Sequence, residues 1–493
     1  MPRARTATPR RRLAAVAAAV GLAAVGMGAI AGVGDRTPAA VPTVAPPPGD
    51  PGEAIVDPYA WDPGRADDFT RRAAAGTSHL LYRLSPGGVA ASAQRTARWR
   101  TQVEAAASAA GVDADTLEGL VFLESAGRED AVTPAGIEGA AGLTQIVAGT
   151  AIDLLGMRVD VRRSKALTRR IARAAAQRRR GRVTALERER ARVDERFDPV
   201  KALAGTARYL KLARERFGRE DLAFVSYHMG IGNLEGVLRA FGAGEDTSYA
   251  EVYFDSTPAR HPAAYARLSA FGDDSSNYLW KVGAAREIMR LWREDPAELG
   301  HLAALHAAKA SAEEVLHPAG TVERFADAAQ LRAAWERGDL RAFPDNPART
   351  GLARDPRMGE LAGRLGRPAA LYRGLRPEAL ALALYVGAQA RALSGTAPLV
   401  VTSTVRDEAY QRALVRRNPE ATRNYSLHTT GWAFDVERSY RSRRQALAFQ
   451  FLLDRLQVLG VIAWAREPDA IHITVSGDAR RLLGLLDRIQ PAP

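Results

Sequence analysis

The chain of 493 residues contains no cysteine. This absence excludes disulfide-stapled scaffolds, Cys-ligated zinc or iron–sulfur sites, and thiol nucleophiles. The fold must therefore be held by hydrophobic cores, which a composition with 46% hydrophobic and 25% charged residues can supply. Any metal must be bound through nitrogen and oxygen, and only eight histidines are present to supply nitrogen. The length suggests about three units, at about 150 residues per domain.

The N-terminus has the features of an export signal. Five arginines within residues 1–12 precede an uncharged run at residues 13–33. Ala29 and Ala31 form a small-x-small cleavage site. As a helix with a rise of about 1.5 Å per residue, the uncharged run is also long enough to span a bilayer. We expect residues 1–34 to be either a cleaved signal peptide or a retained membrane anchor. The rest of the chain is then secreted or anchored outside the cytoplasm, at the cell wall.

Two further segments stand out by composition. Residues 35–66 are rich in proline, which predicts a stiff, extended linker. Residues 158–196 are basic, lack proline, and are rich in Ala, Arg and Glu, which predicts a solvated helical hairpin inserted between other elements.

The net charge of +13 favours polyanionic partners such as nucleic acid, anionic lipid or an acidic cell-wall polymer. The basic segment contains no aromatic residue before Phe197 that could stack on bases. Together with export, this favours an acidic wall polymer over nucleic acid, and we expect membrane contact only through the N-terminal segment.

The first candidate site is centred on Glu124. Asp115 and Glu118 resemble a capping box that opens a helix, and Leu117, Leu120 and Val121 then fall on one helix face. Glu124 continues that apolar stripe. Burial on this face would raise the pKa of its carboxyl group and prepare it to donate a proton near neutrality. The alternative is that Glu124 ends the helix and turns outwards to solvent.

Three ordered blocks accompany this residue: Glu124-Ser125, then Gly142-Leu143-Thr144-Gln145, then Tyr227-His228-Met229-Gly230-Ile231-Gly232-Asn233. Over residues 96–290 this order resembles the soluble lytic transglycosylase family, with its Glu-Ser, Gly-Leu-x-Gln and Tyr-Asn-Ala-Gly-x-Gly blocks. The resemblance implies a mainly α-helical, lysozyme-like domain at residues 67–300 that cuts the MurNAc–GlcNAc bonds of peptidoglycan glycan strands.

The same resemblance implies roles for individual residues. Glu124 would be a single acid/base that leaves a 1,6-anhydro product. The substrate-binding residues would be Ser125, Gln145, Tyr227, Asn233 and Tyr278. The chain departs from the family at His228 and Met229, which replace the usual Asn-Ala. Hydrolysis would need a second carboxylate, and Asp130 and Asp153 are available, so a hydrolytic reaction stays open.

The second candidate site lies near the C-terminus. A helical stretch at residues 378–393 is followed by an apolar strand at 399–403. In two later strands apolar residues alternate with polar ones, so that Asp435 and His472 each point away from a core face. His428 approaches from the loop before the first of them. Two imidazoles and one carboxylate form a three-ligand metal site with one position left open.

The motif Ser426-x-His428-x-x-Gly431-x-Ala433-x-Asp435 resembles that of the VanY-type zinc D-Ala-D-Ala carboxypeptidase family over residues 370–485. The resemblance implies a small α+β domain with an antiparallel sheet at residues 370–493, joined to the first domain by a helical connector at 301–369. Zinc would be held by His428, Asp435 and His472, and stem peptides would be the substrate. Arg406 would bind the substrate carboxylate, and Ser426 would line the same pocket.

The general base of this second site has two candidates. The family places a Glu three residues before the last ligand, where this chain has Asp469, while Glu467 lies five residues before it. We favour Glu467, with the intervening residues looped out. If neither carboxylate reaches the reacting groups, the domain would bind peptide or metal without cutting.

Both motif sets point to one polymer. The sequence therefore predicts a multidomain, exported peptidoglycan-remodelling enzyme. It does not indicate which bond of the stem peptide is cut. The competing hypothesis is a peptidoglycan-binding scaffold protein with one or both sites inactive.

Overall fold

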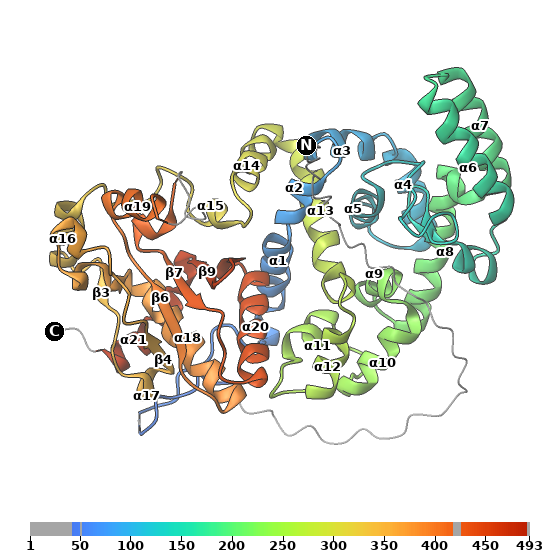
Figure 1. Ribbon diagram of the computed structural model, residues 1–493. Coiled ribbons are helices and arrows are strands. Elements are labelled where there is room, and N and C mark those ends of the chain that lie inside the picture. Colours follow the sequence, from blue (N-terminus) through green and yellow to red (C-terminus); the bar gives the residue numbers. More distant parts are fainter. Residues whose placement is uncertain (1–41, 50–51, 418–424, 491–493) are drawn as a thin grey trace, which may run out of the picture.

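The computed structural model describes residues 42–49, 52–417 and 425–490 (Figure 1). The predicted export segment at 1–34 lies outside this part of the chain. The protein is mostly helical, with one five-stranded mixed sheet in its C-terminal half. Within the described part, no helix is both long and apolar enough to cross a membrane.

The N-terminal half is helical, as expected. Its central pair is α5 (Ala114–Ser125) and α13 (Tyr278–Glu294), which pack against each other closely because Gly119 has no side chain: a Cβ atom there would meet the carbonyl oxygen of Val282 at 2.8 Å. The other helices of this half are α1 (Ala66–Thr77), α2 (His79–Leu84), α3 (Val89–Ala97), α4 (Arg100–Ala110), α8 (Pro199–Phe217), α9 (Glu220–Met229), α10 (Ile231–Phe241), α11 (Tyr249–Asp255) and α12 (Pro262–Ala270).

The start of α5 corrects the predicted capping box. The helix is capped by Asp113, whose side chain accepts a hydrogen bond from the backbone N–H of Thr116 at 2.9 Å. Glu118 cannot reach back to the helix start, because its buried carboxylate forms ion pairs with Arg100 and Arg293. The apolar stripe is confirmed, since Leu117, Leu120 and Val121 are all fully buried.

The basic segment forms the predicted helical hairpin. Its two helices, α6 (Val161–Ala176) and α7 (Arg180–Val193), pack against each other and stand out at one end of the molecule (Figure 1). Their shared core is small and consists of Leu167, Ala174 and Leu186 with partly buried neighbours.

The C-terminal sheet has the strand order β4-β6-β7-β9-β8. Its strands are β4 (Leu352–Arg354), β6 (Leu399–Ser403), β7 (Ala433–Glu437), β8 (Ile462–Arg466) and β9 (Ala470–Val475). The sheet is mixed, rather than antiparallel as expected, because β4 pairs with β6 in parallel. One face packs under α18 (Pro377–Ser394) and α20 (Arg443–Val458), and the apolar residues predicted to alternate on β7 and β9 lie in that core.

Residues 301–369 are more than the predicted helical connector. They contain α15 (Glu313–Leu316) and α16 (Ala328–Glu336), but also the edge strand β4. The backbone N–H of Phe325 donates to the carbonyl oxygen of Thr429 at 2.7 Å, and Leu331 packs in one cluster with Val405. The C-terminal unit therefore begins well before residue 370. A three-residue strand is too short to show a period-2 pattern in the sequence.

The two halves share one continuous hydrophobic core. Arg455 of α20 is partly buried at their junction and donates to the carbonyl oxygens of Tyr253, Phe254 and Ser256 at the end of α11. Helix α1 approaches the end of α20 so closely that a Cβ atom on Gly76 would clash with backbone carbonyl groups there. The two halves are thus packed together through α1, α11 and α20.

The described part of the proline-rich segment is not a free spacer. Val44 and Tyr59 are buried, and Thr43 forms a β-bridge with Val56. The carboxylate of Asp57 accepts hydrogen bonds from Tyr385 and Gln389 of α18, at 3.0 Å and 3.1 Å. The expectation of an extended linker at 35–66 is therefore wrong for these residues, because side-chain contacts that proline content does not reveal hold them against the C-terminal half.

Candidate functional site

The structure brings Glu124 and Tyr278 together. Glu124 lies at the last turn of α5 and Tyr278 at the first residue of α13, and the close packing of the two helices sets these ends side by side. The hydroxyl of the buried Tyr278 donates to Oε1 of Glu124 at 2.6 Å. Two residues predicted from separate motifs thus form one hydrogen-bonded pair.

Burial raises the pKa of Glu124 to about 7, and the hydrogen bond from Tyr278 lowers it only in part. Among the described residues, no second carboxylate contributes to this shift. A carboxyl group with a pKa near 7 is populated in both protonation states at neutral pH. It can therefore donate a proton in one step and accept one in the next.

Tyr227 and the Gly142–Gln145 loop lie beside this pair. The hydroxyl of Tyr227 donates to the carbonyl oxygen of Thr144 at 2.8 Å. Burial and the nearby charge of Glu124 raise the pKa of Tyr227. Gln145 adopts a left-handed backbone conformation with φ of 52°, and its side-chain amide donates to the carbonyl oxygen of Gly142 at 2.8 Å. Such strained backbone at a non-glycine residue is concentrated at functional sites.

The other two predicted substrate-binding residues have local structural contacts. Ser125 is buried, and its hydroxyl donates to the carbonyl oxygen of Val121 one turn earlier, at 3.2 Å. This hydrogen bond supports the helix end, and the contact of Ser125 with substrate stays a prediction. Asn233 is exposed at the start of α10 and donates to the carbonyl oxygen of Met229 at 2.8 Å. Its contact with substrate stays a prediction.

His228 is a member of this cluster that the motif did not assign. Its ring stacks on Tyr278 with centroids 4.9 Å apart, and its Nδ1 lies 3.1 Å from Oγ of Ser275. The sequence feature that could have identified His228 is its position next to Tyr227, where the family pattern has asparagine. It helps to hold the tyrosine that contacts Glu124.

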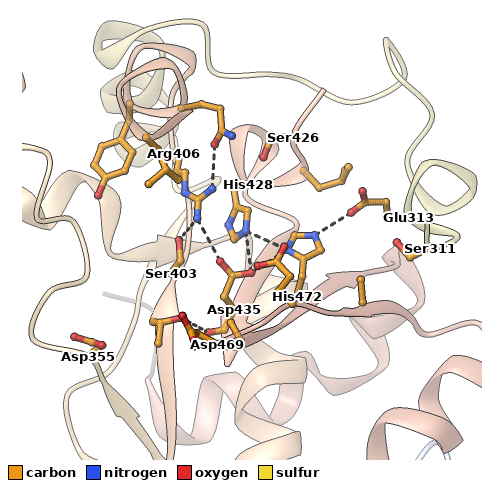
Figure 2. A pocket seen from close by; sticks show the side chains of 18 of the residues that line it. Ser311, Glu313, Asp355, Ser403, Arg406, Ser426, His428, Asp435, Asp469 and His472 are labelled. Atoms are coloured by element: carbon orange, nitrogen blue, oxygen red, sulfur yellow. Dashed lines mark hydrogen bonds and ion pairs between the residues drawn. The ribbon is translucent and has the colours of Figure 1, made fainter. Parts of the chain in front are cut away.

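The three predicted metal ligands converge in the C-terminal half (Figure 2). Asp435 on β7 lies directly opposite His472 on β9 in the antiparallel register, and His428 comes from the short helix η7 (Leu427–Thr430). Nε2 of His428 lies 3.1 Å from Oδ1 of Asp435 and 3.2 Å from Nδ1 of His472. The distance from Nδ1 of His472 to Oδ1 of Asp435 is 2.9 Å. These three side chains form a possible metal site.

In each imidazole, the ring nitrogen that faces away from the possible metal site lies within hydrogen-bond distance of an acceptor oxygen. Nδ1 of His428 lies 2.8 Å from the carbonyl oxygen of Thr404, which leaves Nε2 for a cation. Nε2 of His472 lies 2.9 Å from Oε2 of Glu313, which leaves Nδ1. Burial, followed by the charge of Arg406, lowers the pKa of His428 to about 4. The ring of His428 is therefore neutral at physiological pH, as a metal ligand requires. Burial would lower the pKa of His472, but hydrogen bonds with Asp435 and Glu313 outweigh it and raise the pKa to about 10, so His472 must release a proton when it binds a cation.

Glu313 is the site residue that sequence reasoning missed. It lies on α15, in the segment predicted to be a connector, and is buried. Its carboxylate bridges His472, Thr474 (3.1 Å) and Lys309 (2.7 Å). Burial would raise the pKa of Glu313, but the hydrogen bond with His472 and the charges of His472 and Lys309 outweigh it and lower the pKa to about 2. No motif spacing connects residues that lie so far apart in the chain.

A cavity of about 580 Å³ opens beside these residues, and Arg406, Ser426, Glu467 and Asp469 all line it. Arg406 donates to Oγ of Ser403 at 2.7 Å and lies 3.3 Å from Oδ2 of Asp435. Its Nε atom is buried without a hydrogen-bond partner among the described residues. A guanidinium group held in this way is prepared to bind an anionic group in the cavity.

The two candidate bases lie at the turn between β8 and β9. The backbone N–H of Glu467 donates to the carbonyl oxygen of Ala470 at 2.9 Å, so Pro468 and Asp469 form the looped-out tip, as expected. Both carboxylates line the cavity, and the choice of Glu467 as general base stays a prediction.

The sequence of the chain matches no family model and no curated protein. Its likeness to known families therefore rests on the residue blocks described above, and its chemistry rests on the geometry of the two sites. One half carries a partly buried carboxyl group paired with a tyrosine, and the other carries a possible metal site beside an arginine-lined cavity.

Proposed function

We propose that this chain is an extracytoplasmic peptidoglycan-remodelling enzyme, with one site for stem peptides and one for glycan strands. The observation that carries the proposal is the convergence of Nε2 of His428, Oδ1 of Asp435 and Nδ1 of His472 at the wall of a cavity that also contains Arg406. A pair formed by Glu124 and Tyr278 in the other half supports the second activity.

At the peptide site, two imidazoles and one carboxylate are a donor set that fits zinc with one position left open. Bound zinc would act as a Lewis acid on the scissile carbonyl group. Arg406, which lines the cavity, binds the terminal carboxylate of the stem peptide through its guanidinium group. Glu467, or alternatively Asp469, accepts a proton from the water that attacks the scissile carbonyl carbon and passes that proton to the leaving amine as the peptide bond breaks.

At the glycan site, Glu124 protonates the glycosidic oxygen and then accepts the proton of the muramyl 6-hydroxyl as that group attacks C1. The product is a 1,6-anhydromuramyl end. This route needs one acid/base group, whereas hydrolysis uses two carboxylates. Among the residues that the structure describes, no second carboxylate contributes to the pKa shift of Glu124, which favours the first route.

The test is a digest of purified sacculi by the wild-type chain, followed by mass spectrometry of the products. We expect both anhydromuramyl ends and shortened or cleaved stem peptides. Reducing ends in place of anhydromuramyl ends would show a muramidase. Retention of the chain on sacculi without any new product would overturn the enzymatic proposal in favour of a binding scaffold.

Glu313→Gln is expected to weaken zinc binding by about 10- to 100-fold, because the amide no longer provides the negative charge that orients and polarises His472. Glu314→Gln is the matched control: Glu314 lies 3.6 Å from Lys309 and forms no contact with His472 among the described residues. Calorimetric titration of the purified chains with zinc measures both affinities. Equal affinities for the two variants would contradict the role of Glu313.

Tyr278→Phe is expected to move the pH profile of glycan cleavage. The tyrosine hydroxyl stabilises the ionised form of Glu124, so its removal raises the pKa of Glu124 above about 7. The first step needs the protonated form, so activity falls as the pH rises through this pKa. The descending limb of kcat/KM on soluble glycan fragments should shift to higher pH by about one pH unit.

Tyr227→Phe is the control for this shift, because the hydroxyl of Tyr227 donates to Thr144 and not to Glu124. A descending limb that stays in place in Tyr278→Phe, or that moves equally in both variants, would exclude the proposed effect on Glu124.

A further inference from the structure

The positive charge of the chain is concentrated in one small element. We define the basic hairpin as residues 158–196, which contain α6 and α7. It carries fourteen arginines and one lysine against five acidic residues, a net charge of +10, whereas the whole chain carries +13. The remaining residues are therefore close to neutral, so the positive potential of the molecule has its source at this end.

The basic hairpin is firmly attached at its base. Arg196 is fully buried, pairs with Asp194 at 2.9 Å, and donates to the carbonyl oxygens of Ile137 and Gly139 at 2.7 Å and 2.8 Å. Gly142 packs against the backbone of Arg196, because a Cβ atom there would clash with it. The hairpin is thus anchored to the same loop that presents Gln145 beside Tyr227.

Most of its arginines have no internal partner. Arg163 and Arg170 approach Glu189, Arg158 pairs with Glu195, and Arg190 and Arg196 are buried. The nine other arginines are exposed, and their side chains form no hydrogen bond or ion pair with any described residue. Four of them, Arg178, Arg179, Arg180 and Arg182, cluster at the tip. Like charges brought together in this way repel one another unless external anions compensate them.

The side chains on the surface of the basic hairpin indicate which kind of anionic partner it fits. Guanidinium groups bind phosphate with two parallel hydrogen bonds, as they also bind carboxylate, so a phosphate-bearing polymer is a partner that this surface fits. The hairpin has no aromatic residue for base stacking. None of the large exposed hydrophobic residues of the described chain lies on it, so it lacks the apolar face with which amphipathic helices enter a bilayer.

We propose that the basic hairpin binds a linear, phosphodiester-linked polyanion that carries no bases. The regular charges of such a polymer lie along the exposed arginine surface of α6 and α7. Because the base of the hairpin holds the loop next to Tyr227, the bound polymer is kept on the Glu124 side of the molecule. The inference rests on the charge and exposure of the hairpin and is independent of either proposed reaction.

The test uses the full chain and fluorescently labelled poly(glycerol phosphate) at a series of salt concentrations. The tip variant combines Arg178→Gln, Arg179→Gln, Arg180→Gln and Arg182→Gln. The control variant removes the same charge from exposed, unpartnered arginines of the other half, through Arg332→Gln, Arg364→Gln, Arg444→Gln and Arg480→Gln. Glutamine and arginine have similar helix propensities, so both variants are expected to fold.

We expect the tip variant to bind at least about tenfold more weakly than the wild type, with a shallower dependence of affinity on salt, and the control variant to retain binding. Equal weakening in both variants would overturn the proposal, since net charge and not the hairpin would then be responsible. Tighter binding to single-stranded DNA of matched charge, or to phosphatidylglycerol vesicles, would overturn the choice of partner.

Hydrogen exchange on the wild-type chain provides a second measurement that needs no variant. Added poly(glycerol phosphate) should slow exchange within residues 158–196. Unchanged exchange in this segment at saturating polymer would also overturn the proposal.

Discussion

Glu124→Gln should lower the rate at which the chain releases glycan fragments from sacculi by about 10²- to 10⁴-fold, the contribution expected of a general acid/base. The amide has nearly the same shape as the carboxyl group but cannot deliver a proton to the glycosidic oxygen. It can still accept the hydrogen bond from Tyr278, so the contact between α5 and α13 should persist. Release of soluble muropeptides, followed by mass spectrometry, measures the loss.

Asp130→Asn and Asp153→Asn are the matched controls for this variant. Both side chains are exposed, and neither contributes to the pKa of Glu124. If either change abolished cleavage and the products of the wild-type chain carried reducing ends, the reaction would be a two-carboxylate hydrolysis. Full activity in Glu124→Gln would contradict the assignment of the glycan site altogether.

The second large effect is expected from His428→Ala. The change removes one of three ligands, and the remaining pair, Asp435 and His472, no longer surrounds a cation on three sides. We expect bound zinc to fall from about one equivalent to none, together with loss of stem-peptide cleavage. Metal analysis of the purified chain and the peptide part of the muropeptide profile report the two effects separately.

His301→Ala is the control, because His301 is exposed on α14 (Pro296–Ala308) and is not one of the three residues of the possible metal site. A wild-type chain that takes up no zinc would exclude the metal site, and a His428→Ala variant with full zinc content would exclude His428 as a ligand. Since the two sites use different residues, His428→Ala should keep glycan cleavage and Glu124→Gln should keep peptide cleavage. An inactive scaffold would show neither loss.

The local features of both sites were predictable from short-range patterns. Alternation of apolar and polar residues placed Asp435 and His472 on one face of two strands, and the register of β7 and β9 confirms this arrangement. The apolar stripe on α5 indicated that Glu124 points toward the core side of the helix, and there it contacts the buried Tyr278 and desolvation raises its pKa. Composition alone was enough to predict the hairpin of α6 and α7.

Contacts between distant segments were not predictable in this way. Glu313 reaches His472 from a segment that had only mixed helical patterning, and β4 joins the sheet with three residues. Asp57 is held by Tyr385 although it lies in the proline-rich segment at residues 35–66. Each of these contacts joins segments that are far apart in the sequence and depends on how the whole chain folds. A pattern within one segment carries no information about such a contact.

The sequence by itself determined which residue types are available and which face of each helix or strand they occupy, because side-chain periodicity follows directly from backbone geometry. It therefore identified Glu124, His428, Asp435 and His472 as candidates. Only the tertiary structure decided that Tyr278 contacts Glu124, that Glu313 contacts His472 beside the possible metal site, and that the two halves share one core. These outcomes depend on the packing of helices and strands against one another, which is set by the whole chain at once.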